Sequence, residues 1–242
     1  MTVLFWDIDG TLITTRRAGM YAWNDSVKEL TGLEFDLKVQ VRTAGLTDYQ
    51  IAVKTVELLG LEPEEALIER LVRRYEALLP SSLPLKDGSV LPNVREILEH
   101  LRDRADVRSY LLTGNTRGGA RAKLTYFGLM EFFPDGAFAE DAGARSAIAA
   151  RALELARRAA PVADDRVFVI GDTPHDIECA RAIGARTIAV ATGGYALDEL
   201  RAYDPWRAFG ELPPVDEFVT LIDGEMPRRK EAGDRRKEMT GS

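Results

Sequence analysis

Short apolar runs that alternate with helical patterns are the feature of this sequence that most restricts its fold. The runs are rich in β-branched and large apolar side chains and lie at residues 2–6, 107–112, 167–170 and 187–191, with a weaker one near 136–139. The helical patterns between them lie at residues 93–104, 117–127, 145–159 and 174–183. Continuous apolar runs of this length suit strands that are buried on both faces of a parallel sheet. The alternation predicts an α/β fold with a doubly wound parallel sheet.

One long stretch, from about residue 15 to residue 84, interrupts this alternation. It contains no convincing strand, and its helical patterns lie at residues 18–31, 47–59 and 63–79. Seventy residues of helix are far more than a crossover between parallel strands requires. We therefore expect residues 15–84 to form an inserted α-helical cap subdomain. The core is then formed by residues 1–14 and 85–224, with hinges near 13–17 and 81–88.

The C-terminal stretch, residues 225–242, differs from the rest in composition. It is polar and mixes six Lys and Arg residues with acidic ones. Such a segment buries too little apolar surface to fold and predicts a solvated, disordered tail. A basic arm that binds nucleic acid is the alternative interpretation of the same residues.

The balance of charge limits the partners of this chain. Thirty-two Lys and Arg against 39 Asp and Glu give a net charge of −7, so the chain has no overall attraction for nucleic acid or anionic lipid. No apolar stretch approaches the roughly 20 residues of a membrane span, and the six residues before Asp7 are too few for a signal peptide. One cysteine, Cys179, and two histidines exclude an internal disulfide and a His-rich metal site. We expect a cytoplasmic enzyme or binding module without a nucleic-acid or membrane partner.

An acidic segment, Asp7-Ile8-Asp9-Gly10-Thr11, follows directly on the first predicted strand. Ligands of open α/β sheets bind at the carboxyl ends of the strands, where this segment lies. Two acids at positions i and i+2 can turn into one crevice once the chain leaves the strand, and Gly10 allows the sharp exit. A turn or a helix cap, for which Asp-Gly is common, is the alternative interpretation.

Two further strand ends bring polar side chains to the same edge. The second long strand is followed by Thr113-Gly114-Asn115, and the strand at 167–170 is followed by Gly171-Asp172, with Asp176 four residues later. Three carboxylates around one hard cation make a site of the Mg²⁺ kind, completed by oxygen ligands and water. Without a cation their mutual repulsion is costly.

These segments together resemble the motifs of the haloacid dehalogenase (HAD) superfamily of phosphohydrolases, particularly its phosphoglycolate-phosphatase-like members. The first motif matches residues 7–11, the second residues 113–115, and the fourth Gly171 and Asp172 with Asp176. The resemblance extends from residue 2 to about residue 222, and residues 15–84 fall where such enzymes carry a cap. It implies a Rossmann-like core and a Mg²⁺-dependent hydrolase of phosphate esters.

The third motif is where the sequence departs from the family pattern. The family usually places a lysine just before the helix that leads to the fourth motif, and residues 140–146 contain none. Arg145 has about the right spacing, and a guanidinium can neutralise the same charge. Lys123, on the helix after Thr113, is the other candidate, with a surface lysine as the alternative interpretation. We favour Arg145.

The resemblance also implies roles for these residues. Asp7 is the expected nucleophile, which forms an aspartyl-phosphate. Asp9 is expected to protonate the leaving alkoxide and then to deprotonate the water that opens the intermediate. The expected metal ligands are Asp7, the backbone carbonyl of Asp9, and Asp172. The expected phosphate-binding groups are Thr113, Asn115 and the backbone N–H groups near Ile8 and Gly114, with Arg145 or Lys123 beside them; the supporting residues are Gly10, Thr11 and Asp176.

The cap is expected to select the substrate. Residues 42–48 correspond to the loop that reaches into the active site of similar enzymes, with Gly45 for close approach and Arg42 as a partner for a carboxylate or phosphate. Thr47 and Gln50 also form the pattern of a capping box at a helix start.

Several functions are compatible with these residues. The leading hypothesis is a phosphatase of a small phosphorylated metabolite, either phosphoglycolate-like or a sugar phosphate. A phosphomutase would use the same aspartyl-phosphate, and a phosphonate hydrolase would need a cap lysine, for which Lys28, Lys38 and Lys54 are available. A non-catalytic phosphate-binding module is the fourth hypothesis, and the oligomeric state, monomer or homodimer, stays open.

Overall fold

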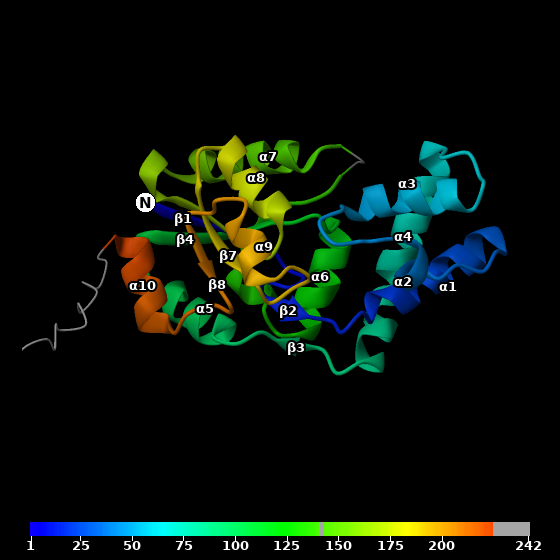
Figure 1. Cartoon of the computed structure of the whole chain (residues 1–242), viewed down its shortest axis with the longest axis horizontal. Coiled ribbons are helices and arrows are strands. Elements are labelled where there is room, and N and C mark those ends of the chain that lie inside the picture. The colour runs from blue at the N-terminus through cyan, green and yellow to red at the C-terminus, as the bar shows by residue number, and fades with distance from the viewer. Residues whose placement is uncertain (141–142, 225–242) are drawn as a thin grey trace, which may run out of the picture.

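Among residues 1–140 and 143–224, which this computed structural model describes, six strands form one sheet with every neighbouring pair parallel (Figure 1). The strands stand in the order β5-β4-β1-β6-β7-β8. Their bounds are β1 Thr2–Trp6, β4 Val107–Leu112, β5 Gly136–Ala137, β6 Val167–Gly171, β7 Arg186–Val190 and β8 Arg207–Phe209. The chain winds outward from β1 in both directions, so the predicted doubly wound α/β fold is confirmed.

Each face of the sheet is covered by helices. Leu4 and Trp6 of β1 pack in one cluster with α5, α6 and α10, whereas Val3 and Phe5 pack in another with α7 and α8. In Figure 1, α7 and α8 lie above the sheet and α5 and α10 below it. The bounds are α5 Val94–Arg102, α6 Arg117–Tyr126, α7 Arg145–Ala159, α8 Pro174–Ala182, α9 Leu197–Arg201 and α10 Val215–Asp223. Burial on both faces is the reason that the strands have continuous apolar sequences.

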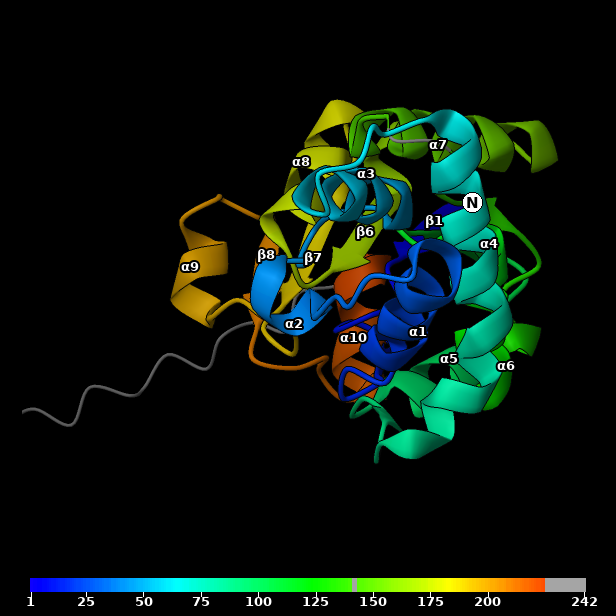
Figure 2. The ribbon, with the colours of Figure 1, turned by 90° about the vertical axis from the view of Figure 1, so that its right-hand side faces the viewer.

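Between β2 (Ile13–Thr14) and β3 (Ser89–Val90), four α-helices pack together at one end of the sheet and form the part of the molecule that we call the cap. Its helices are α1 Gly19–Thr31, α2 Leu37–Gln40, α3 Asp48–Leu58 and α4 Glu65–Ser82. They share an apolar cluster of their own, in which Trp23 meets Tyr75 edge-on at 5.0 Å and donates to the Thr55 hydroxyl at 3.1 Å. Seen from the cap side, these helices lie in front of the sheet (Figure 2).

The two connections between cap and core pair with each other. β2 and β3 form an antiparallel ribbon, with Ile13 opposite Val90 and Thr14 opposite Ser89. The backbone N–H of Leu91 extends the contact by donating to the Leu12 carbonyl at 3.0 Å. Two-residue strands leave no periodic pattern, which explains why the sequence indicated only hinges here.

The helix predicted at residues 63–79 is α4 in the structure, and it extends beyond the predicted end. α4 continues through Pro80 to Ser82, where the hydroxyls of Ser81 and Ser82 both donate to the Leu78 carbonyl. A short 3₁₀ helix, Leu83–Leu85, follows, and two more lie at Met130–Phe132 and Asp164–Arg166. Within the described residues, no helix has both the length and the apolar character needed to cross a bilayer. The predicted disordered tail, residues 225–242, lies outside the described residues.

Candidate active site

The residues that follow the three central strands meet at the carboxyl edge of the sheet. β1 is in parallel register with both β4 and β6, so these strands end at a similar level. Asp7 follows β1, Thr113 follows β4, and Asp172 follows β6. The backbone N–H of Asp7 donates to the Ile170 carbonyl at 3.0 Å, which holds the first acid against the neighbouring strand.

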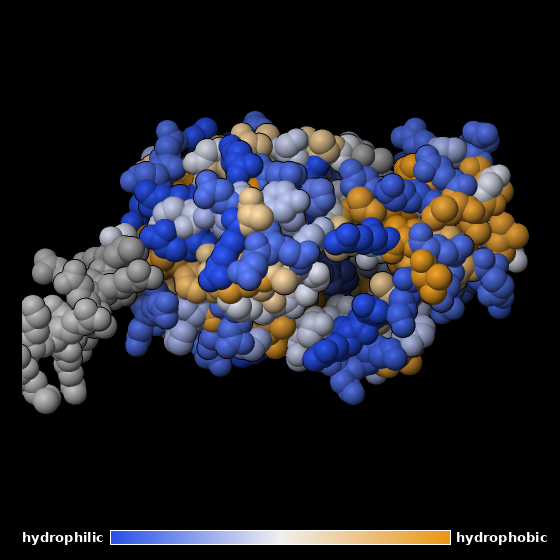
Figure 3. Space-filling model, viewed as in Figure 1, coloured by the Kyte–Doolittle hydropathy of each residue, from blue (hydrophilic) through white to orange (hydrophobic). Residues whose placement is uncertain are grey.

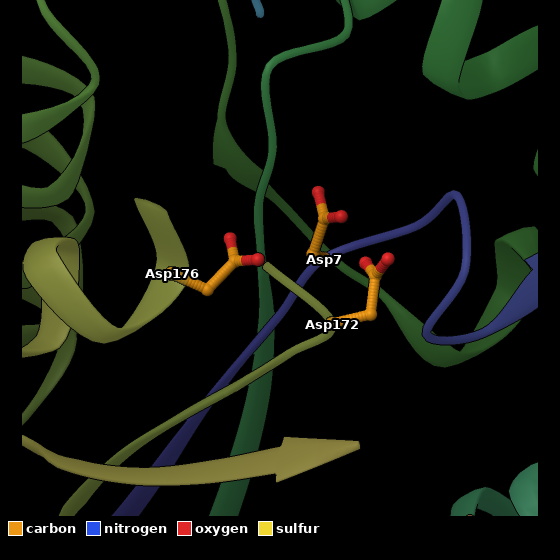
Figure 4. Close-up of side chains that lie close together, drawn as sticks. All are labelled: Asp7, Asp172 and Asp176. Atoms are coloured by element: carbon orange, nitrogen blue, oxygen red, sulfur yellow. The ribbon is translucent and has the colours of Figure 1, made fainter. Parts of the chain in front are cut away.

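Three buried carboxylates, those of Asp7, Asp172 and Asp176, lie together at this edge (Figure 4). Each offers one oxygen, and these oxygens lie within 4.8 Å of one another. Burial, with the charge of Asp176 next in size, raises the pKa of Asp7 to about 7. Burial and the charge of Asp7 raise the pKa of Asp172 well above its usual range. A cation placed among these groups would relieve both penalties.

The surroundings of Asp172 hold its carboxylate oxygens in a position that suits a divalent cation. The Thr11 hydroxyl donates to Asp172 Oδ1 at 3.3 Å. The backbones of Gly10 and Gly193 press against the same carboxylate: a Cβ on Gly193 would lie 1.7 Å, and one on Gly10 2.5 Å, from Asp172 Oδ2. A carboxylate held this tightly beside that of Asp7 presents hard oxygen ligands in fixed positions, as Mg²⁺ prefers.

Arg145 is the cation beside the nucleophile candidate. It is the first residue of α7, and its side chain is only 11% exposed. Its Nη2 lies 2.7 Å from Asp176 Oδ1 and 3.8 Å from Asp7 Oδ1. Burial disfavours the charged form, but the carboxylates of Asp176 and Asp7 raise the pKa of Arg145 above its usual value. Of the two candidates for the third-motif cation, Arg145 is the one that faces Asp7.

Lys123 faces the second acid of the first motif instead. Its Nζ donates to Asp9 Oδ2 at 2.5 Å and to Asn115 Oδ1 at 2.6 Å. The Asn115 amide in turn donates to Asp9 Oδ2 at 2.9 Å and to Thr113 Oγ1 at 2.8 Å. Burial opposes the charge of Lys123, but the charge of Asp9 raises the pKa of Lys123 above its usual value. The carboxylate of Asp9 thus lies against Lys123 and Asn115, and it is not one of the three clustered carboxylates.

Asp176 has two structural partners. Its Oδ1 receives the Arg145 bond, and its Oδ2 accepts from the backbone N–H of Thr173 at 3.0 Å and from the Thr173 hydroxyl at 2.7 Å. The residue therefore caps α8 and also orients Arg145.

The remaining second-motif residues form the floor of the site. The buried Thr113 hydroxyl lies beside Asp7 and accepts from the Asn115 backbone N–H at 3.2 Å. A Cβ on Gly114 would lie 3.0 Å from the Leu46 carbonyl of the cap and 3.3 Å from Arg145 Nη1. The side chain of Ile8 is fully buried, and its carbonyl accepts from three following backbone N–H groups. Close backbone approach therefore brings the cap loop to the edge of the acid cluster.

The cap loop contributes Gly45 but not Arg42. Gly45 has φ of +80°, lines the cavity, and its carbonyl accepts from Arg145 Nη1 at 3.4 Å. A Cβ at this position would lie 2.0 Å from His175 Cδ2, so only glycine fits. Arg42 is exposed and lies over the ring of Tyr195, 5.4 Å from its centroid, outside the residues that line the cavity. The geometry assigns no substrate contact to Arg42, because cation–π stacking turns its side chain away.

A cavity of about 500 Å³ opens between cap and core above these residues. Figure 3 shows the surface hollowed where the two parts meet. Core residues of its lining include Asp7, Asp9, Asn115, Lys123, Arg145 and Asp172, and cap residues include Met20, Trp23, Ile51 and Tyr75. The lining thus combines convergent polar groups with apolar side chains of the cap, a pattern typical of small-molecule sites.

Two contributions to the site were missed in the sequence. The first is Asp48, at the start of α3, whose carboxylate accepts from the Thr116 backbone N–H at 2.8 Å while its own N–H donates to the Gly114 carbonyl at 2.9 Å. Burial raises the pKa of Asp48 to about 6, although nearby Lys123 opposes this shift. In the sequence, Asp48 follows the capping residue Thr47 and indicates only the start of a helix. Its role in the site could not be seen there, because its partners Thr116 and Gly114 belong to the core.

The second is the loop after β7. The Thr192 hydroxyl donates to the Gly10 carbonyl at 2.5 Å, and Gly193 lies against Asp172. The sequence did contain a signal for this loop. Thr192 and two glycines directly follow the predicted strand at 187–191, and polar and small residues after a parallel strand lie at the edge where ligands bind.

Residues 3–190 match the family model described as haloacid dehalogenase-like hydrolase. The chain belongs to this family. The resemblance drawn from the motifs is therefore confirmed.

Curated relatives and solved structures match this chain over most of its length. The chain is 28% identical over 207 residues to the probable phosphatase IndB of Dickeya dadantii, covering 84% of this chain and 86% of the relative. It is 26% identical over 225 residues to the phosphoglycolate phosphatase of Rhodospirillum rubrum, covering 91% of this chain and 89% of the relative. The HAD hydrolase, family IA, variant 3, of Entamoeba histolytica superimposes with a TM-score of 0.69 at 20% identity, covering 92% and 100%. CbbY of Rhodobacter sphaeroides, solved with phosphate, gives 0.66 at 18% identity, covering 87% and 95%.

Proposed function

We propose that this HAD-family hydrolase is a Mg²⁺-dependent phosphatase that cleaves a small phosphorylated metabolite through an aspartyl-phosphate on Asp7. The observation that carries the proposal is that Asp7 lies 3.8 Å from the guanidinium of Arg145 and within 4.8 Å of the carboxylate of Asp172, which could hold a cation beside it. A carboxylate nucleophile must approach an anionic phosphate, so positive charge is needed on both sides of it. The names of the two curated relatives, both phosphatases, support the same reaction class.

In the first step the Asp7 carboxylate attacks phosphorus and the bond to the alkoxide breaks. The Thr113 hydroxyl, which lies beside Asp7, orients the nucleophile, and Arg145 neutralises charge on the phosphoryl oxygens. Held by Asp7, Asp172 and the Asp9 carbonyl, Mg²⁺ would supply Lewis-acid stabilisation of the same charge. No base is needed to activate Asp7, because the cations beside it favour the ionised carboxylate.

Asp9 is suited to the proton transfers of both steps. Its side chain is 40% exposed and lines the cavity, where the leaving group and later the water would lie. As an acid it would protonate the alkoxide, and as a carboxylate it would take a proton from the water that attacks the phosphoenzyme. The two steps share one geometry, so a single residue can serve both.

The cavity lining supports a small substrate with an anionic phosphate and a second polar or anionic end. Arg16 and Arg17 are exposed at its margin, and both have positive φ, +49° and +69°. Non-glycine residues in this region store strain, and such residues cluster at functional sites. Two arginines there suit a carboxylate or hydroxyl end of a phosphoglycolate-like molecule or a sugar phosphate. A cytoplasmic location is proposed from the sequence.

We expect the purified protein to hydrolyse p-nitrophenyl phosphate with Mg²⁺ and to lose this activity in excess EDTA. The closely spaced acids need the cation for the anionic substrate to approach.

Asp172→Asn should raise the Mg²⁺ concentration for half-maximal rate about tenfold or more, because one of two charged ligands is lost. The measurement is phosphate release against Mg²⁺ concentration.

Phosphate release also separates the competing functions. A phosphomutase would isomerise a sugar phosphate with little phosphate released, and a binding module would turn over neither substrate. A panel of phosphoglycolate, sugar phosphates and nucleoside monophosphates then ranks the substrates by kcat/KM. Turnover unchanged in EDTA after dialysis would contradict the metal-dependent reaction.

The Asp9→Asn protein should show a loss that depends on the leaving group. With an alkyl phosphate kcat/KM should fall by about 10²–10⁴-fold, because the alkoxide leaves unprotonated. With p-nitrophenyl phosphate the first step should be nearly unchanged, since p-nitrophenolate is a weak base, and phosphoenzyme should accumulate. Rapid-quench measurement of both substrates checks this, and equal losses for the two would contradict the acid role of Asp9.

A further inference from the structure

Lys123 lies at the junction of core and cap, and its side chain is only 7% exposed. It stands on α6, and its Nζ contacts Asp9 Oδ2 and Asn115 Oδ1 from the core. From the cap, the buried side chains of Tyr75 and Asp48 lie close enough to interact with the charge of Lys123. A buried ammonium with partners on both sides is costly unless its geometry is well fixed.

The contacts of Asp9 distinguish its two oxygens. Both Lys123 and Asn115 bind Oδ2, so Oδ1 is the oxygen that neither of them engages. Asp9 lines the cavity, and its side chain is 40% exposed although that of Lys123 is almost fully buried. Lys123 and Asn115 therefore fix one carboxylate oxygen of a residue that lines the cavity, and neither of them occupies the other oxygen.

We propose that Lys123 is the positioning residue of Asp9 and that it couples this carboxylate to the cap through Tyr75. The inference rests on the proposed function, in which Asp9 moves the protons. Lys123 lies beside Asp9, Asn115, Tyr75 and Asp48, whereas the cation that faces Asp7 is Arg145. Lys123 thus supports the steps that use Asp9 and not the attack of Asp7.

The hydrolytic step is where this role can be isolated. Water oxygen attacks phosphorus, its proton goes to the Asp9 carboxylate, and the bond from phosphorus to the Asp7 oxygen breaks, which returns the Asp7 carboxylate and inorganic phosphate. With p-nitrophenyl phosphate the preceding step needs no proton from Asp9. A defect in the placement of Asp9 therefore slows the second step and spares the first.

The test is a rapid-quench comparison of the parent and Lys123→Met with p-nitrophenyl phosphate and Mg²⁺. Methionine has a similar length and no charge. We expect a burst of about one p-nitrophenolate per site, at a rate within about threefold of the parent, followed by a steady-state rate about 10–100-fold lower. Phosphoenzyme should accumulate in proportion. The matched control is Arg121→Met, which removes an exposed cation from the same helix and should behave as the parent.

Two outcomes would overturn the inference. A steady-state rate within twofold of the parent would show that Lys123 does not act through Asp9. A burst rate that falls in parallel with the steady-state rate would show that Lys123 acts on the attack by Asp7. The proposed function is tested separately by the parent, because failure to form any phosphoenzyme there would remove the aspartyl-phosphate mechanism itself.

A second variant keeps the inference testable if Lys123→Met does not fold. Tyr75→Phe removes only the cap hydroxyl beside Lys123 and keeps the ring within the cap cluster. We expect a several-fold lower steady-state rate with an unchanged burst rate. Parent-like kinetics in Tyr75→Phe would overturn the coupling to the cap, and a slowed burst would overturn the assignment to the hydrolytic step.

Discussion

Asp7→Asn should abolish turnover, with a fall in kcat of roughly 10⁴-fold or more, as for other nucleophile deletions. The side-chain amide has the same shape but cannot attack phosphorus, and no phosphoenzyme should be trapped after acid quench. The measurement is phosphate release together with phosphoenzyme recovery from a labelled substrate. Residual turnover near the parent rate would remove Asp7 from the covalent mechanism.

The same substitution should stabilise the protein when no metal is bound. Burial and the charge of Asp176 raise the pKa of Asp7 to about 7 from an ordinary value of 3.8. An acid whose folded-state pKa is raised binds more protons in the folded than in the unfolded chain, so it costs stability as the pH rises from about 4 to 7. The asparagine is neutral throughout this window. In EDTA, the Tm of Asp7→Asn should therefore exceed that of the parent at pH 8 and approach it near pH 4.

Magnesium should reverse this order, which provides the control. A cation that binds the folded state alone raises its Tm by mass action. The parent presents the carboxylates of Asp7 and Asp172, whereas the variant retains only the second. Titration with Mg²⁺ should raise the Tm of the parent more than that of Asp7→Asn. A variant destabilised in EDTA at pH 8 would contradict the raised pKa of the buried carboxyl.

The central strands and their acid-bearing edge could be predicted because local sequence determines them, whereas the short edge strand β8 was not predicted. β1 and β4 match the predicted strands at both ends, and β6 and β7 lie within one residue of prediction. Parallel strands buried on both faces leave continuous apolar runs, and the polar residue after each run must lie at the carboxyl edge. Asp7, Thr113 and Asp172 are brought together by this rule alone.

Features that depend on contacts between cap and core could not be predicted. The sequence left Arg145 and Lys123 as alternatives for one role, and the structure places them beside different carboxylates. Arg42 was expected at the substrate and lies on Tyr195 instead, because the choice between a cavity and an aromatic ring is made by tertiary packing. Asp48 has its partners on a loop 68 residues away. No local pattern records such a pairing.

Arg145→Met should give the largest combined loss of stability and activity outside the nucleophile. Removing one partner of a buried ion pair leaves the carboxylates of Asp176 and Asp7 uncompensated, which should lower the free energy of unfolding by about 3–5 kcal/mol. The rate should fall by about 10²–10³-fold, because a positioned donor to the phosphoryl group is lost. Urea unfolding in EDTA and phosphate release in Mg²⁺ measure the two effects.

The pH dependence of Arg145→Met should identify the carboxyl on which the guanidinium acts. The charge of Arg145 lowers the pKa of Asp7, so its removal should move the acid limb of the kcat profile to higher pH. Arg145→Lys should restore part of this shift, because it keeps the charge but not the fork that reaches both carboxylates. In an Asp7→Asn background the cost of Arg145→Met should shrink by about 1 kcal/mol or more, since one of the two charges is already gone. An undiminished cost in that background would mean that Arg145 serves Asp176 alone, and the cation that the phosphoryl group needs would then have to come from elsewhere in the site.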